Sequence, residues 1–149
     1  MKKKIIYLDN CTFNRPFDDQ TRLEIKFEAE AKLHIQEMIK NGTLELVWSC
    51  ILEYENAQNP FPYRKYTILQ WKKIAKYYIL GNNDIIKKAQ EIISFGLKSK
   101  DAIHISCAIE AEADYFITTD KDILKKMRNF RETTVIDPVN FILKLEEQR

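Results

Sequence analysis

The sequence predicts an α/β fold in which helices cover both faces of a central, mainly parallel sheet of four to five strands. Short apolar runs rich in β-branched and aromatic residues alternate with longer segments whose apolar residues recur at helical spacing. Such alternation is typical of a three-layer α/β/α fold. Two of the apolar runs are followed closely by acids, Asp9 and Asp120. The length of 149 residues suits one domain that spans residues 1–149.

Two strand–helix units account for the first part of the chain. The run IIYL suits a buried parallel strand, and turn residues follow it. Helical spacing then continues up to Asn41-Gly42, a pair that commonly ends helices. The next apolar run precedes Ser49, a candidate helix N-cap. In order, the expected elements are strand Lys4–Leu8, loop Asp9–Arg15, a helix from about Gln20 to Lys40 capped by Asp18 or Asp19, a strand over 44–48, and a helical segment that holds Glu53 and Glu55.

Helices dominate the remainder. Asn59-Pro60-Phe61-Pro62 interrupts the helical pattern, and Gly81-Asn82-Asn83 separates the next two helices. Ser99 is the candidate cap of the helix that follows. The expected elements are helices near Arg64–Leu80, Asp84–Phe95 and Lys100–Glu112, strand Tyr115–Thr118, a short basic helix Lys121–Arg128, strand Thr133–Ile136, and a last helix from Pro138 to about Glu146.

Composition excludes several classes of protein. Hydrophobic residues make up 45% of the chain and charged residues 31%, which argues against disorder. No apolar run reaches the roughly 20 residues of a membrane helix, and IIYL is too short for a signal peptide. We therefore expect a cytoplasmic protein that makes no use of a membrane. The cysteines, Cys11, Cys50 and Cys107, are widely spaced without a CxxC pair, which predicts small buried side chains rather than a zinc site or disulfides.

The net charge of +2 conceals a gradient along the chain. Residues 1–59 carry 8 Lys/Arg against 10 Asp/Glu, a net of −2, whereas residues 60–131 carry 14 against 8, a net of +6. A basic middle beside a cluster of acids would suit a polyanion held across a metal site. The imbalance is modest, however, and on charge alone solvated helix faces are the simpler interpretation.

Three acids occupy corresponding places in the expected fold. Asp9 and Asp120 follow strands, and Asp101 lies in the first turn of a helix, where the dipole favours a carboxylate. The carboxyl ends of parallel strands meet at one edge of a sheet, where ligands bind. Acids gathered there repel one another unless a cation neutralises them, and Mg²⁺ prefers oxygen ligands. Each acid alone would be an ordinary helix-start residue, but together they predict a metal site for phosphate chemistry.

A fourth acid is expected from the segment SCILEYEN. Glu53 and Glu55 are two residues apart, so on a helix they point about 200° away from each other and only one faces the cluster. Glu55 lies four residues after Ile51, in line with an inward-facing apolar position. Glu53 lies one turn after Ser49 and suits an N-terminal capping arrangement. We favour Glu55, and Glu53 stays open as the alternative.

A family resemblance rests on four segments that occur in order across nearly the whole chain: IIYLDNCTFNRP, LVWSCILEYEN, KSKDAIHISCAIEAEADYFITTDKDIL and TTVIDPVNFI. They resemble the PIN domain family. The resemblance implies an α/β/α nuclease in which three or four acids bind Mg²⁺ or Mn²⁺ and cut RNA, leaving 3′-hydroxyl and 5′-phosphate ends. It assigns both the catalytic and the metal-binding role to Asp9, Glu55, Asp101 and Asp120, with Glu55 six residues past Ser49. The loops CTFNRPFDDQ and NPFPYRKY are unusual, so the resemblance stops at the family.

The expected function is therefore that of a metal-dependent endoribonuclease that hydrolyses phosphodiester bonds of single-stranded RNA. The resemblance also implies the toxin half of a toxin–antitoxin pair, with an antitoxin as partner, and a homodimer. The aromatic residues around Leu69–Tyr78, with Trp71, Tyr77 and Tyr78, are candidates for the dimer surface, and core packing is an equal alternative for them. A catalytically inactive PIN-like module that binds RNA or protein remains open. A flavodoxin-like phosphotransfer or nucleotide-binding domain is disfavoured, because three glycines cannot supply a phosphate loop.

Further residues are weaker candidates around this site. His104 lies one turn beyond Asp101 and is expected near the acids, whereas His34 lies on an ordinary amphipathic helix. Basic side chains close to the expected site are candidates for phosphate contacts, and aromatic ones for stacking on unpaired bases. The former are Arg15, Arg64, Lys65 and Lys121, and the latter are Phe13, Phe61 and Tyr63.

Overall fold

The computed structural model describes residues 2–148, and its centre is a five-stranded parallel sheet with the order β3-β2-β1-β4-β5. The strands are β1 (Lys4–Leu8), β2 (Leu44–Ser49), β3 (Tyr77–Ile79), β4 (Tyr115–Ile117) and β5 (Thr134–Ile136). The helices are α1 (Asn10–Asn14), the 3-10 helix η1 (Arg15–Phe17), α2 (Leu23–Lys40), α3 (Cys50–Ala57), α4 (Pro62–Ile74), α5 (Asn83–Ile93), α6 (Ser99–Glu110), α7 (Lys121–Lys126) and α8 (Pro138–Glu147).

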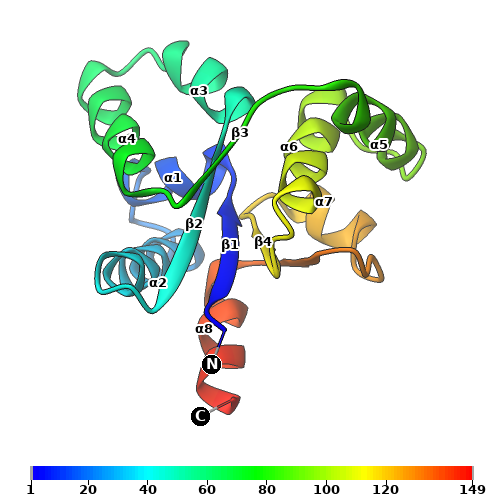
Figure 1. Cartoon of the computed structure of the whole chain (residues 1–149). Helices are drawn as coiled ribbons and strands as arrows, with labels where there is room; N and C mark the ends of the chain where they lie inside the picture. The colour runs from blue at the N-terminus through cyan, green and yellow to red at the C-terminus, as the bar shows by residue number, and fades with distance from the viewer. Residues whose placement is uncertain (1, 149) are drawn as a thin grey trace.

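Helices flank the sheet on both sides. In Figure 1, α2 and α4 lie on one side of the strands and α5, α6 and α7 on the other, while α8 packs against α2. The chain therefore has the three-layer α/β/α fold with a parallel sheet that the sequence predicts. The short helix α3 lies at the end of β2 and contacts both α4 and α6. None of the helices in the described part of the chain is long and apolar enough to cross a membrane.

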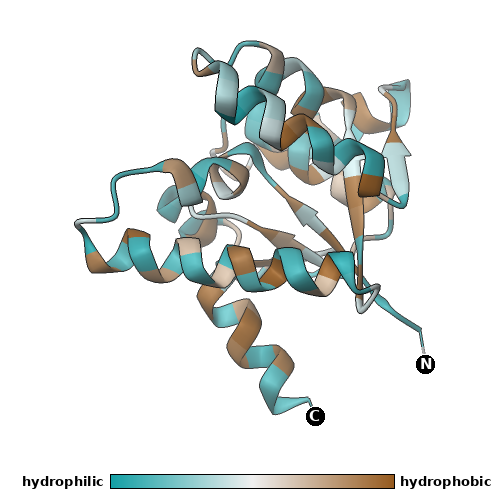
Figure 2. Cartoon of the chain, turned by 90° about the vertical axis from the view of Figure 1, so that its left-hand side faces the viewer, coloured by the Kyte–Doolittle hydropathy of each residue, from teal (hydrophilic) through white to brown (hydrophobic). Residues whose placement is uncertain are grey.

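The central strand β1 owes its place to its composition. Every residue from Ile5 to Leu8 is buried, as a strand covered by helices on both faces requires. Ile6 is in register with Leu46 of β2 and Tyr115 of β4. Figure 2 shows α2 as a helix of mixed hydropathy lying across strands that are largely hydrophobic.

Four strands pass into a helix almost without a loop. A polar residue stands at each junction and caps the helix with its own side chain: Asp9 for α1, Ser49 for α3, Asp120 for α7 and Asp137 for α8. Such caps satisfy backbone N–H groups that have no partner within the helix. Because all strands are parallel, these side chains stand at the same, carboxyl edge of the sheet.

Several expectations about the first half of the chain were wrong. The expected loop Asp9–Arg15 is mostly helix α1, because Asp9 caps it. Helix α2 starts at Leu23 rather than near Gln20, and neither Asp18 nor Asp19 caps it. Asp18 instead pairs with Arg15 and Arg64, and Asp19 accepts a hydrogen bond from the Thr21 N–H.

The expected helix from Arg64 to Leu80 was also wrong. It ends at Ile74, and Tyr77–Ile79 pairs with β2 as an edge strand. Ala75 has an extended backbone, with ψ of 138°, and the Lys76 N–H donates to the Leu46 carbonyl at 2.9 Å.

Two smaller expectations need correction as well. Ser99 is the first residue of α6 rather than its cap. Among the cysteines, only Cys107 is buried; Cys50 is partly exposed and Cys11 is exposed.

Candidate functional site

Asp9 is the most constrained acid at the carboxyl edge of the sheet. It follows β1 directly and is only 5% exposed. Its Oδ1 accepts hydrogen bonds from the N–H and the hydroxyl of Thr12, both at 3.0 Å, and its Oδ2 accepts one from the Thr118 hydroxyl at 2.5 Å. Burial raises the pKa of Asp9, and the bonds from Thr118 and Thr12 oppose the rise in part. The carboxylate is thus held in one orientation and poorly solvated.

Asp120 stands beside Asp9 because β4 is the neighbour of β1. Its Oδ1 accepts hydrogen bonds from the N–H groups of Asp122 at 2.9 Å and Ile123 at 3.3 Å. Its own N–H donates to the Thr118 hydroxyl at 3.1 Å. Thr118 therefore connects the two acids: its hydroxyl donates to Asp9 and accepts from the backbone of Asp120.

Asp101 enters the same region from the first turn of α6. Its pKa is raised, first by burial, then by the negative charge of Asp120, with a smaller contribution from Glu55. Although the residue as a whole is exposed, poor solvation of its sulfur raises the pKa of the Cys11 thiol, at the start of α1, to about 12, together with the charges of Asp9, Asp120 and Asp101. These mutual effects indicate that the four acids share one region of unfavourable negative potential.

Glu55 reaches the site through a buried hydrogen-bond chain. The Glu55 carboxylate bonds His104 Nε2, and His104 Nδ1 lies 2.6 Å from the Tyr7 hydroxyl. That hydroxyl lies 2.6 Å from Ser49 Oγ, which accepts the N–H of Leu52 at 3.2 Å. One proton arrangement satisfies every atom. Ser49 donates to Tyr7, Tyr7 donates to Nδ1 of a neutral His104, and Nε2–H donates to Glu55.

The alternative acid, Glu53, points elsewhere. Its carboxylate pairs with Lys72 of α4 at 2.6 Å, and this ion pair lowers the pKa of Glu53. The two glutamates of α3 thus face different helices, Glu55 toward α6 and Glu53 toward α4.

Some of the weaker candidates lie where they cannot act as expected. Phe13 is completely buried against Trp48, so it cannot stack on a base. Arg15 is committed to Asp18, Glu28 and Thr119.

Two other basic candidates are also engaged. Arg64 bonds Asp18 and the Phe17 carbonyl, and Lys121 pairs with Glu24 at 2.9 Å. Phe61 and Tyr63 are exposed, as stacking requires.

Sequence reasoning missed the role of Tyr7. It lies within the apolar run of β1, and its ring stacks on Phe116. A buried tyrosine hydroxyl nearly always needs a partner. That need, together with a histidine one turn after Asp101, was the signal that could have indicated the Tyr7–His104 pair.

The donor chemistry of this region suits a hard divalent cation, because all four acids offer carboxylate oxygens. A cation would also relieve the repulsion that raises the pKa of Asp101. Within residues 2–148, however, no three His, Cys, Asp or Glu side chains are arranged as a ready metal site. Holding a cation would therefore require some of the carboxylates to turn from their present partners.

Comparisons with known proteins bear on the fold. No protein-family model matches the sequence, and no curated protein matches it either. The chain is similar to a chain in the crystal structure of VapBC2 from Rickettsia felis bound to a DNA fragment from their promoter. The TM-score is 0.55 at 12% sequence identity, and the match covers 89% of this chain and 98% of that one. This likeness confirms the PIN-like fold that the sequence predicts.

Proposed function

We propose that this PIN-like chain is a metal-dependent endoribonuclease that hydrolyses phosphodiester bonds of single-stranded RNA. The observation that carries the proposal is the group of acids at the carboxyl edge of the sheet. Asp9 is buried, and the pKa of Asp101 is raised first by burial and then by the charges of Asp120 and Glu55. Such an arrangement costs stability unless something positive binds it, so it suits a function rather than packing.

Asp9, Asp101 and Asp120 would hold Mg²⁺ or Mn²⁺, with Glu55 as a ligand directly or through water. The cation would supply Lewis-acid activation of the attacking water and neutralise charge on the phosphate. The chain supplies the rest. Thr118 and Thr12 hydrogen-bond the carboxylate of Asp9 and limit its rotation.

His104 has a positioning role in this proposal. Its Nε2–H bond limits the rotation of Glu55, and the Tyr7 hydroxyl fixes the ring by bonding the other nitrogen. A histidine that is 3% exposed and bonded at both nitrogens has little freedom to act on the RNA itself. We therefore assign to it the placement of Glu55, as outer-shell partners do at other metal sites.

The proposal extends to a toxin role with an antitoxin as partner. The similar structure is that of VapBC2 bound to promoter DNA, and that assembly motivates the extension. A homodimer is proposed from the family resemblance of the sequence alone.

The test is cleavage of an end-labelled single-stranded RNA with Mn²⁺ or with EDTA. We expect cleavage only with the cation. Asp9→Asn, Asp101→Asn and Asp120→Asn should each reduce the rate by on the order of a hundredfold or more, since a metal contributes several kcal/mol. The matched control is Asp84→Asn, an exposed acid in the first turn of α5, which should cleave like wild type. Full activity of Asp9→Asn would rule out the proposed chemistry.

A second function has one observation in its favour. The hydrogen bond between Glu55 and His104 occupies an acid that a metal site would use, which suits a non-catalytic module that binds RNA or protein. Such a module would bind RNA without cutting it, and EDTA would not change the binding.

A further inference from the structure

A basic hollow lies beyond the far end of α7. Its volume is about 330 Å³, and its lining includes Lys125, Lys126, Arg128 and Arg131 together with the rings of Phe95 and Phe130. No carboxylate of the described residues lines it. Four cations around one concavity without an acid create a local positive potential that favours an anionic ligand.

A second hollow of about 510 Å³ continues the first one. Lys125 and Arg128 line both, and Lys121 adds a cation from the start of α7. One acid, Asp137, lines this second hollow. Its carboxylate is occupied as the cap of α8, accepting the Asn140 N–H at 2.9 Å and the side-chain amide at 2.6 Å.

The cations of these hollows differ in how far the protein itself neutralises them. Lys126 pairs with Asp122 at 2.9 Å and donates to the Gly96 carbonyl at 2.8 Å. Among the described residues, no ion pair involves Lys125, Arg128 or Arg131. These three are therefore the charges most available to a ligand.

Helix α7 connects the hollows to the acids. Asp120 caps its first turn, Lys121 and Lys125 lie four residues apart on one face of the helix, and Arg128 follows in the turn just after it. Lys125 is five residues after Asp120, a rise of about 8 Å along the helix. A strand bound at the acids could therefore continue over α7 and reach Lys125 and Arg128 within a short distance.

An aromatic side chain distinguishes a nucleic acid from other polyanions at this place. Phe95 is 52% exposed and meets Phe130 edge-to-face, with ring centroids 6.0 Å apart. One face of a ring fixed in this way can stack on an unpaired base, which every nucleotide offers irrespective of sequence. An acidic protein segment would gain charge pairing here but no comparable stacking.

We infer that the two hollows along α7 form a binding track for single-stranded RNA. Lys125, Arg128 and Arg131 contact phosphates flanking the bond to be cut, and Phe95 stacks on one base. This deepens the proposed function and rests on it for the identity of the polyanion. It also moves the phosphate contacts away from Arg15 and Arg64, which are neutralised within the protein.

The experiment measures binding separately from cleavage. A fluorescein-labelled oligouridine is titrated with protein in EDTA, and the dissociation constant is followed by anisotropy at several salt concentrations. We expect the triple variant Lys125→Ala/Arg128→Ala/Arg131→Ala to bind about tenfold or more weakly. For this variant, the slope of log affinity against log salt concentration should shrink by about two, since each phosphate contact on a single strand contributes about 0.7 to that slope. Phe95→Leu, which keeps an apolar side chain, should weaken binding several-fold without changing the slope.

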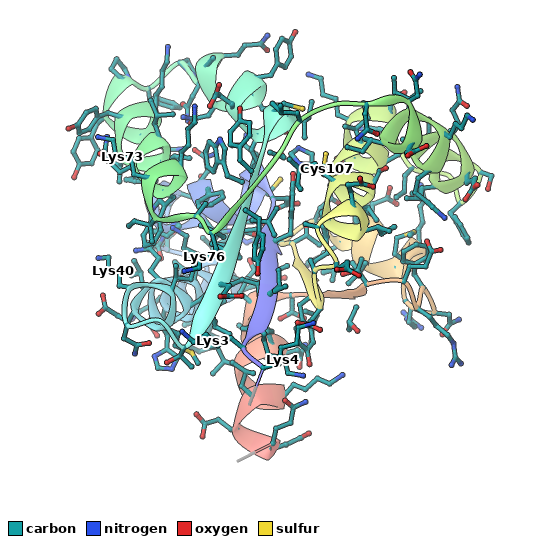
Figure 3. The ribbon with its side chains drawn as sticks, in the orientation of Figure 1. Lys3, Lys4, Lys40, Lys73, Lys76 and Cys107 are labelled. Atoms are coloured by element: carbon teal, nitrogen blue, oxygen red, sulfur yellow. The ribbon has the colours of Figure 1, made fainter. Side chains whose placement is uncertain are left out.

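A matched control removes the same charge elsewhere. Figure 3 shows Lys3, Lys73 and Lys76 on the side of β2 and α4, away from α7, and all three are exposed. Lys3→Ala/Lys73→Ala/Lys76→Ala should bind the oligouridine like wild type. An equal loss of affinity in both triple variants would overturn the track, because it would reflect net charge alone.

Two further outcomes separate this inference from the proposed function. If wild type cuts RNA and the Lys125/Arg128/Arg131 triple variant binds RNA as tightly as wild type does, the track is wrong and the nuclease stands. If wild type does not cut RNA, but the Lys125/Arg128/Arg131 triple variant and Phe95→Leu both bind it more weakly, the track stands and the nuclease proposal fails. Displacement of the oligouridine by polyglutamate as readily as by unlabelled RNA would overturn the track in favour of an acidic protein partner.

Discussion

Asp9 is the residue on which the proposed site depends most. Its charge is buried, so in the absence of a cation its ionised form is destabilising. A buried acid with a raised pKa binds its proton more tightly in the folded state than in the unfolded state. Its contribution to stability therefore falls as the pH rises above the ordinary value of 3.8 and through the raised pKa.

Asp9→Asn is accordingly expected to stabilise the metal-free protein while abolishing cleavage. The amide keeps the shape and removes the charge whose burial disfavours the folded state, so the free energy of unfolding should rise at neutral pH. Urea unfolding in EDTA measures this free energy. A lower free energy of unfolding in the variant would show that the ionised carboxylate serves the fold rather than a ligand.

Tyr7 tests the positioning of Glu55. Tyr7→Phe removes the hydroxyl between Ser49 and His104 and leaves Nδ1 of a buried imidazole without its donor. We expect a loss of about 1–3 kcal/mol in the free energy of unfolding. Because Glu55 would lose its fixed partner, kcat should fall several-fold with KM for RNA unchanged.

The matched control for Tyr7→Phe is Tyr115→Phe on the adjacent strand. Tyr115 is also buried and packs edge-to-face with Phe141. The substitution Tyr115→Phe should change neither kcat nor KM. A Tyr7 variant that loses stability but keeps wild-type kcat would limit the chain from Ser49 to Glu55 to a structural role.

At the scale of elements, the helix α2 buries Lys32, which forms no ion pair with any acid of residues 2–148 and donates only to the side-chain oxygen of Gln36. Lys32 is 2% exposed, and its ammonium lies over the rings of Phe13 and Trp71, at 5.1 and 5.3 Å from their centroids. Burial lowers the pKa of Lys32 to about 7. Between that value and its ordinary value of 10.5, the unfolded chain binds more protons than the folded one, so stability rises with pH across this window.

Lys32→Met should remove this pH dependence. The variant keeps an unbranched side chain in the same space and should be more stable than wild type by about 2–4 kcal/mol at and below neutral pH, with the difference shrinking as pH rises. Urea unfolding at a series of pH values measures it, with the exposed Lys26→Met on the same helix as control. A difference that stays constant with pH would mean that Lys32 does not lose its proton in the fold.

Predictability from sequence also varies by element. The runs of β1 and β2 and the helices α5, α6 and α8 were predicted within a few residues, because buried runs and periodic apolar faces are local signals. The strand β3 was not, because its three residues continue a helical pattern and only pairing with β2 makes them a strand. Helix α1 was missed for the opposite reason, since a single cap at Asp9 starts a helix in a segment of turn residues.

In the candidate site, too, local sequence signals predicted some features and tertiary contacts decided the others. The positions of Asp9, Asp101 and Asp120 at strand ends and a helix start could be predicted from local order. The facing of Glu55 and the partnership of Tyr7 with His104 depend on how α3 and α6 meet across the sheet, which no local pattern contains. Trp71 illustrates the same limit: the sequence left it open between a dimer surface and the core, and the fold buries it, at 5% exposure.

For the whole molecule, divalent cations should act as stabilising ligands. A cation at ten times its dissociation constant would add about 1.4 kcal/mol to the free energy of unfolding. For a chain of this size that corresponds to a rise in Tm of roughly 3–6 °C. Thermal unfolding with Mg²⁺ or EDTA measures it, and the rise should vanish in Asp101→Asn and Asp120→Asn but not in Asp84→Asn. An equal rise in all variants would indicate binding elsewhere on the surface.

The central claim is that these acids together hold a divalent cation, and diffraction from a crystal soaked in Mn²⁺ tests it most directly. The anomalous signal of manganese identifies the ion independently of any assumed chemistry. We predict a peak bounded by the carboxylates of Asp9, Asp101 and Asp120, with Glu55 bonded to it directly or through water. Absence of a peak there in a crystal that shows manganese elsewhere would contradict the account.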